Sequence, residues 1–167
     1  MTAAHDQADP AAPWGVPADA LAFLIKEARL ADEHAYEAWE SLWDDEALYW
    51  VPRDPERPWD TQFSYIADNR ARLHSRIAQL CTGHRYSQVP QSRMRRMLSN
   101  FEVTSQDAEL TQVACNFVLH EYRLGATVWA GRYRYTIAHR TDGLRLRKKV
   151  VELVNAAGPI PTLGFLI

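Results

Sequence analysis

Apolar residues recur at helical spacing in the first half of the chain. After Pro17 they stand three and four positions apart, at Leu21, Leu24, Ile25 and Ala28. This spacing predicts a helix that turns one apolar face inward. A shorter stripe follows at Ala35, Trp39, Leu42 and Trp43. A further helix is predicted over 69–81, with Leu73, Ile77, Leu80 and Cys81 inward and Gly83 as its stop.

The spacing changes to a period of two in the second half. Apolar and polar residues alternate over 97–103, 113–120 and 129–137. Asp142-Gly143 favours a hairpin turn, after which a last strand is predicted from Leu144 to about Asn155. Earlier, Ala47–Pro52 reads ALYWVP, a β-rich run that ends at a proline without an N–H. Helices followed by long strands predict an α+β fold, with the helices packed on one face of a curved, mainly antiparallel sheet.

The length of 167 residues suits one domain. Residues 1–16 are rich in alanine, proline and polar residues, which predicts a flexible N-terminal arm before a single domain over 17–167. No apolar run approaches the ~20 residues of a membrane span, and no signal peptide is visible, so a cytoplasmic location is expected. Cys81 and Cys115 are interpreted as buried thiols in a reducing compartment, with a disulfide between them left open.

Three arginines gather in Ser92–Asn100, which reads SRMRRMLSN. Such a cluster could bind a polyanion, but 19 Lys and Arg stand against 21 Asp and Glu, and nucleic-acid-binding domains are usually basic. On a strand, Arg93 and Arg95 point to one face and Arg96 to the other, so the three cannot form one basic face. A structural or interfacial role is therefore favoured, without nucleic acid as a partner.

Metal and nucleotide motifs are absent from the sequence. No two of the six histidines stand at i, i+4, and neither G-x-G-x-x-G, a Walker loop nor G-x-S-x-G occurs. Helices over a strongly curved sheet could still enclose an aromatic pocket with an acid or base in it. Its candidate lining is Tyr49, Trp50, Tyr65, Trp129, Tyr133 and Tyr135, with Asp32, Asp68 or His84 as the acid or base. The alternative interpretation is that these aromatic residues fill the core.

Several segments together resemble the small (beta) subunit of bacterial aromatic-ring-hydroxylating dioxygenases, the Rieske non-haem iron oxygenases. They are Glu27–Trp50, the overlapping run ALYWVP of Ala47–Pro52, the pattern of Arg72-Leu73, Arg76-Ile77, Leu80 and Thr82-Gly83, and Pro90–Asn100, PQSRMRRMLSN. The last of these is the most specific. Leu146–Asn155 and the apolar end Gly164–Ile167 also look like this family, so the resemblance covers nearly the whole domain.

The resemblance implies a cone-shaped fold of the nuclear-transport-factor-2-like (NTF2-like) kind. It implies a large (alpha) subunit as partner, carrying the Rieske 2Fe–2S cluster and the mononuclear iron, in an assembly of three large and three small chains. The small chain itself would then have no cofactor and no catalytic residue, and would self-associate as a trimer. Candidate interface or structural residues are Arg93, Arg95, Arg96, Asn100, Trp50 and Pro52. Thr162–Ile167, TLGFLI, is expected to be surface that a partner covers. The alternative is a free-standing isomerase or dehydratase with an acid or base in the cone pocket.

Overall fold

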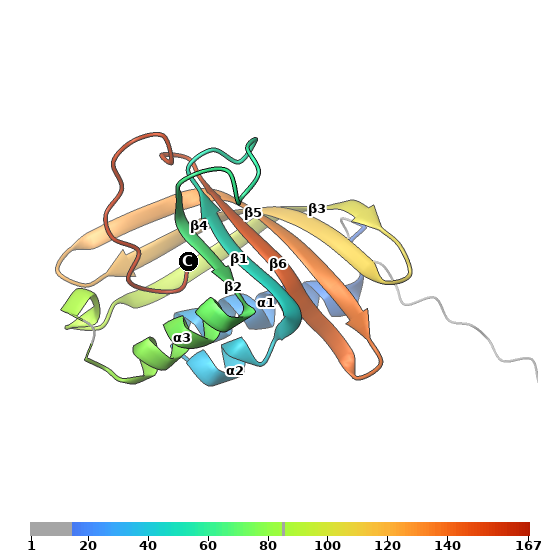
Figure 1. Cartoon of the computed structure of the whole chain (residues 1–167), viewed down its shortest axis with the longest axis horizontal. Helices are drawn as coiled ribbons and strands as arrows, with labels where there is room; N and C mark the ends of the chain where they lie inside the picture. The colour runs from blue at the N-terminus through green and yellow to red at the C-terminus, as the bar shows by residue number, and fades with distance from the viewer. Residues whose placement is uncertain (1–14, 85) are drawn as a thin grey trace, which may run out of the picture.

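The structure, a computed structural model, describes residues 15–84 and 86–167. It is an α+β fold, as the spacing predicts, in which three helices lie beneath a strongly twisted sheet (Figure 1). The helices and strands are, in chain order, α1 (Ala18–Asp32), α2 (Tyr36–Glu40), β1 (Trp43–Pro52), β2 (Ser64–Asn69), α3 (Arg70–Cys81), the 3-10 turn Tyr86–Gln88, β3 (Arg93–Gln106), β4 (Leu110–Tyr122), β5 (Ala126–Arg140) and β6 (Gly143–Leu153).

The six strands form one sheet in the order β2-β1-β6-β5-β4-β3. The four long strands of the second half are the antiparallel meander that the sequence predicts. β1 joins this meander by pairing parallel with β6, and β2 pairs antiparallel with β1 at the sheet edge. β2 was not predicted from the sequence, because it is six residues long and runs directly into α3.

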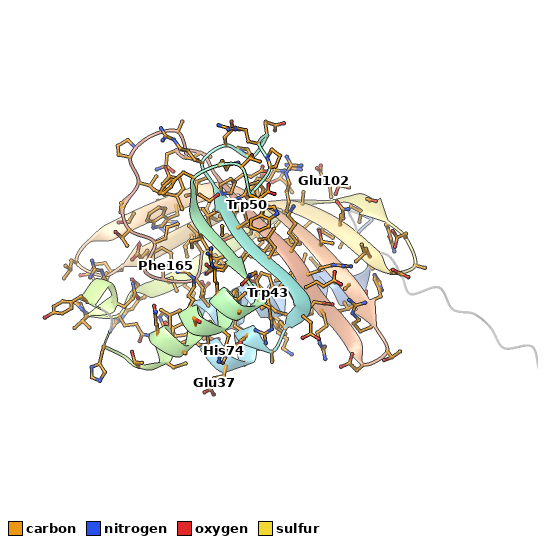
Figure 2. The ribbon with its side chains drawn as sticks, in the orientation of Figure 1. Glu37, Trp43, Trp50, His74, Glu102 and Phe165 are labelled. Atoms are coloured by element: carbon orange, nitrogen blue, oxygen red, sulfur yellow. The ribbon has the colours of Figure 1, made fainter. Side chains whose placement is uncertain are left out.

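The inward faces of the central strands agree with the predicted alternation. The buried residues on β4 and β5 include Val113, Cys115, Phe117, Leu119, Trp129, Tyr133, Tyr135 and Ile137. They pack toward the helices, and α3 contributes Leu73, Ile77 and Leu80 to the same core. Figure 2 shows Trp43 where the sheet meets the helices.

Two predicted core positions are wrong. Ile25 is 53% exposed, because the buried face of α1 is centred on Leu24, Glu27 and Ala31 instead. The charged Glu27 turns inward because its carboxylate meets a lysine within the core. Cys81 is an exposed free thiol, since α3 ends there and the residues that follow it are exposed too, whereas Cys115 is buried as predicted.

The packed domain begins slightly earlier than predicted, and the predicted hairpin turn is present. Residues 1–14 of the predicted arm lie outside the described residues, while Val16 is fully buried, so the packed domain includes at least this residue of the predicted arm. The predicted hairpin turn joins β5 to β6. Arg140 pairs with Gly143, so Thr141 and Asp142 form the turn and Gly143, at φ 122°, opens the next strand.

Gly131, in the middle of β5, sits where two backbones come unusually close. It pairs with Phe117 on β4 and Leu153 on β6. A Cβ atom at this position would lie 2.0 Å from the Glu152 carbonyl oxygen and 3.0 Å from the Phe117 ring. Only glycine leaves room for this crossing of strands, which helps to curve the sheet around the helices.

Gly131→Ala should therefore destabilise the fold by about 1–3 kcal/mol, the usual cost of overpacking, because a backbone carbonyl cannot move aside as a side chain can. Gly125→Ala is the matched control, since a Cβ there meets nothing within 4 Å. It should leave the free energy of unfolding within about 0.5 kcal/mol of the parent value. Urea denaturation of the two variants measures the difference, and equal midpoints would contradict the close approach.

Candidate functional site

Arg96 is the buried member of the arginine cluster. Its side chain is 0% exposed, and its Nε donates to Asp32 Oδ1 at 2.7 Å while its backbone N–H donates to Asp32 Oδ2 at 2.8 Å. Its Nη1 donates to the Tyr133 hydroxyl at 3.3 Å and its Nη2 to the Leu166 carbonyl oxygen at 2.7 Å. One guanidinium therefore joins β3 to α1, to β5 and to the last segment of the chain.

The charge of Arg96 is maintained despite its burial. Burial alone would lower the pKa of Arg96, but the Tyr133 oxygen and the Asp32 carboxylate outweigh it and hold that pKa above its ordinary value. Arg93 and Arg95 lie on the opposite face of β3 and are exposed, as the strand alternation predicts. The cluster thus divides into one structural arginine and two surface arginines.

A second buried ion pair lies in the same core. Lys149 Nζ lies 2.9 Å from Glu27 Oε1, and both side chains are 0% exposed. Glu27 also accepts hydrogen bonds from Trp39 Nε1 at 2.7 Å and from the Tyr135 hydroxyl at 3.3 Å. The Lys149 ammonium stands 4.3 Å from the centre of the Tyr133 ring. We refer to Glu27, Asp32, Arg96, Tyr133, Tyr135 and Lys149 as the buried polar cluster.

The pKa values of this pair reflect two opposing effects. Burial on its own raises the pKa of Glu27, but Lys149 and then Arg96 outweigh it, so that the pKa of Glu27 lies below its usual value. Burial lowers the pKa of Lys149 to about 8, although the Glu27 charge works against this shift. Neither Glu27 nor Lys149 is among the candidate residues predicted from the sequence.

The last segment of the chain closes the core that holds this cluster. Phe165, Leu166 and Ile167 are buried, and the Trp129 and Phe165 rings meet edge to face at 5.8 Å. The Tyr49 hydroxyl donates to the Ile167 carbonyl oxygen at 2.8 Å and accepts from the Ile167 N–H at 2.9 Å. Figure 1 shows this segment looping away from β6 and returning beneath the sheet, where Figure 2 labels Phe165. The expectation that Thr162–Ile167 is surface for a partner is therefore wrong for its apolar residues, because their own chain covers them.

The aromatic residues proposed to line a pocket do not converge on one. Trp129, Tyr49, Tyr133 and Tyr135 are buried in the core, as the alternative interpretation has it. Trp50 lies on the other face of β1, where its Nε1 donates to Ser64 Oγ at 2.9 Å. The hydroxyl of the half-buried Tyr65 donates to the Ala156 carbonyl oxygen.

The candidate acids and bases are not gathered in a pocket either. Asp32 is paired with Arg96, and Asp68 accepts from Arg76 Nε at 2.5 Å. His84 is exposed on the segment after α3. These three residues come from different parts of the fold, and nothing brings them to one aromatic cavity.

The remaining candidate residues are two backbone positions. Asn100 is exposed and has φ 54°, at the point where the register between β3 and β4 shifts. Asparagine tolerates this left-handed conformation better than most residues, which suits it to a β-bulge. Pro52 is the last residue of β1, next to another register shift, in agreement with its predicted place at a strand end.

Within residues 15–84 and 86–167, no three His, Cys, Asp or Glu side chains gather in a way that could hold a metal ion. Over the same residues, no helix is both long and apolar enough to cross a membrane.

Comparisons with known proteins give one consistent result. A family model described as the ring hydroxylating beta subunit matches residues 26–157. The small oxygenase component of the p-cumate 2,3-dioxygenase system of Pseudomonas putida is 34% identical over 131 residues, which cover 75% of this chain and 72% of that protein. The small subunit of 2-halobenzoate 1,2-dioxygenase from Burkholderia cepacia is 26% identical over 82% of this chain and 87% of its own length.

Solved structures agree with the family match. The beta subunit of benzoate 1,2-dioxygenase from Burkholderia mallei superposes with a TM-score of 0.73 at 29% identity, covering 89% of this chain and 96% of that one. An NTF2-like protein with a cystatin-like fold from Novosphingobium aromaticivorans superposes with a TM-score of 0.56 at 18% identity, covering 82% and 80% of the two chains. The second likeness bears on the fold alone and confirms the NTF2-like cone.

Arg96→Ala should destabilise the fold by roughly 3–5 kcal/mol, because it leaves the buried Asp32 carboxylate without its cation. Arg93→Ala, on the exposed face of the same strand, should cost about 1 kcal/mol or less. Thermal unfolding of both variants measures the contrast, since each kcal/mol corresponds to roughly 2–4 °C for a chain of this size. Similar melting temperatures for the two variants would contradict the division of the cluster.

Lys149→Met should cost roughly 3–5 kcal/mol near neutral pH, because Glu27 then remains as an uncompensated buried charge. Without the lysine, burial raises the folded-state pKa of Glu27 above its unfolded value, so the deficit should shrink as the pH falls toward about 5. In the parent the pKa of Glu27 is lowered from 4.5, so its contribution is lost only below that pH.

Chemical denaturation of Lys149→Met and the parent between about pH 5 and 8 tests this sign. The double variant Glu27→Gln/Lys149→Met is the matched control, because it removes both charges and should recover most of the loss. A deficit in the single variant that stays constant with pH would count against the pair.

Proposed function

The chain belongs to the ring-hydroxylating beta-subunit family and is a small subunit of an aromatic-ring-hydroxylating dioxygenase. We propose that it supports assembly of the large subunit and does not itself catalyse a chemical step. The observation that carries this role is the filled cone. Asp32 and Glu27 are held in buried ion pairs, and the last segment of the chain occupies the space beneath the sheet. A rigid, closed core of this kind suits a scaffold.

We assign the Rieske 2Fe–2S cluster and the mononuclear iron to the large subunit. The family resemblance implies this division of labour, and the donor sets of the described residues do not fit either iron group. A reducing, cytoplasmic location is part of the same proposal, because an exposed free thiol such as Cys81 is typical of such compartments. The aromatic substrate would be selected by the large subunit.

We propose that the large subunit docks on the outer face of the sheet. On this face, opposite the core, several apolar side chains lie close together on β3, β4, β5 and just after the end of β6. We call these residues the outer-face band: Met97, Val118, Val128, Ala130 and Val154. Met97 and Val128 are each 59% exposed and Val154 is 79% exposed. An apolar centre beside arginines, here Arg95, is the usual composition of a protein–protein interface.

The proposed assembly has three large and three small chains, with the small chains also in contact as a trimer. Arg93 and Arg95 lie on the same outward face of β3 as Met97, which makes them the interface candidates of the arginine cluster. Trp50 and Pro52 remain candidates on β1. Trp50 is largely covered by its own chain through Ser64 and Lys148, so it can contribute mainly by shaping the surface around it.

Co-expression with its cognate Rieske-type large subunit tests the function. Purification through a tag on this chain should yield a brown complex that contains iron and the large subunit. Val128→Asp should weaken that association at least about tenfold, because it buries a charge at an apolar interface, while the melting temperature changes little. Phe63→Asp is the control, since Phe63 is 79% exposed but lies on the loop between β1 and β2.

The outcomes separate the function from the proposed face. If the parent chain recovers no large subunit, the assembly role itself is wrong. If the parent forms the complex and Val128→Asp forms it equally well, only the outer-face band is wrong as the docking surface.

A further inference from the structure

The last segment of the chain consists of an exposed connection followed by a short apolar end that packs into the core, much as a bound peptide would. After β6 ends at Leu153, residues 154–162 form no strand or helix and are mostly exposed. At Leu163 the chain turns inward, and Leu163 and the residues from Phe165 to Ile167 are buried. An exposed tether thus connects the sheet to a buried apolar end.

The contacts to this end follow the pattern of peptide recognition. Arg96 donates to the Leu166 carbonyl oxygen, and the Tyr49 hydroxyl bonds both the N–H and the carbonyl oxygen of Ile167. Trp129 packs edge to face against the Phe165 ring. Backbone hydrogen bonds that fix a peptide, together with pockets that take its side chains, are the two elements of a peptide-binding site.

The groups that hold this end have other partners that keep them in place. Arg96 is anchored by Asp32 and Tyr133. The Tyr49 ring packs edge to face against Trp39 at 5.8 Å and against Trp43 at 6.0 Å. These partners lie on α1, α2, β1 and β5, so contacts outside the last segment help to hold Arg96 and Tyr49 in place.

Electrostatics defines the chemistry of the occupant. The two buried cations nearest the site, Arg96 and Lys149, are each already compensated, by Asp32 and Glu27. The donors that face the last segment, Arg96 and the Tyr49 hydroxyl, bind main-chain oxygen atoms of Leu166 and Ile167, and the aromatic and aliphatic walls suit apolar side chains.

We propose that the interior of the cone is a binding site for short apolar peptides, which residues 163–167 fill in the native chain and which accepts the same sequence in trans. This inference does not depend on the assembly role.

The test uses a chain that ends at Thr162 and a fluorescently labelled peptide with the sequence of residues 162–167. The shortened chain should bind the peptide saturably, and the parent should not, because its site is occupied. Replacing the phenylalanine of the peptide by alanine should weaken binding at least about tenfold, because the contact with Trp129 is lost. Tyr49→Phe in the shortened chain should weaken it about tenfold by removing two hydrogen bonds.

A second set of measurements applies when the shortened chain does not fold by itself. If it is unfolded alone, addition of the peptide should restore its circular dichroism spectrum and cooperative melting. If it stays unfolded with peptide, the full-length variant Phe165→Ala, in which the attached segment is held less tightly, should capture the labelled peptide. A folded shortened chain that binds no peptide would overturn the proposal, and so would an unfolded one combined with a full-length variant that captures none.

Discussion

The position of Arg96 is the constraint on which most of this structure depends. A guanidinium without contact to water requires a carboxylate and further acceptors, and these come from α1, β5 and the last segment of the chain. Each of these elements is thereby fixed relative to β3, an edge strand that is otherwise largely exposed. The same helix, α1, carries both Asp32 and Glu27, which pair with Arg96 and Lys149.

Most of the secondary structure could be predicted from the sequence, because strand alternation and helical spacing report directly on burial. The division of the arginine cluster followed from alternation alone, since Arg96 occupies the opposite parity to Arg93 and Arg95. The Glu27–Lys149 pair could not be predicted, because a charged residue in an apolar stripe is usually assigned to solvent. On β6 a register shift after Leu146 reverses which residues of the strand point toward the core, and it turns Lys149 inward. The hydrophobic pattern of the sequence does not reveal such a bulge.

NTF2-like cones can enclose a ligand, and this chain shows how one can be closed. Of the aromatic residues that suggested a pocket, Tyr49, Trp129, Tyr133 and Tyr135 are buried, but the chain's own end and two ion pairs lie in the same core. The core-filling interpretation is therefore confirmed for these four residues. The position of residues 163–167 depends on contacts with β1, β3 and β5 that are distant in the sequence.

The parallel pairing of β1 with β6 also determines the order in which the chain can fold. β1 pairs early with β2, but Tyr49 of β1 also pairs with Lys149 of β6, so the first long strand finds its second neighbour only near the end of the chain. Contacts between such distant segments close large loops and slow folding. During synthesis, the three helices and β1 leave the ribosome well before the sheet that buries their apolar faces. The nascent subunit must therefore remain soluble with one edge of β1 unpaired until β6 emerges, which makes this interval the one in which a chaperone would have most effect.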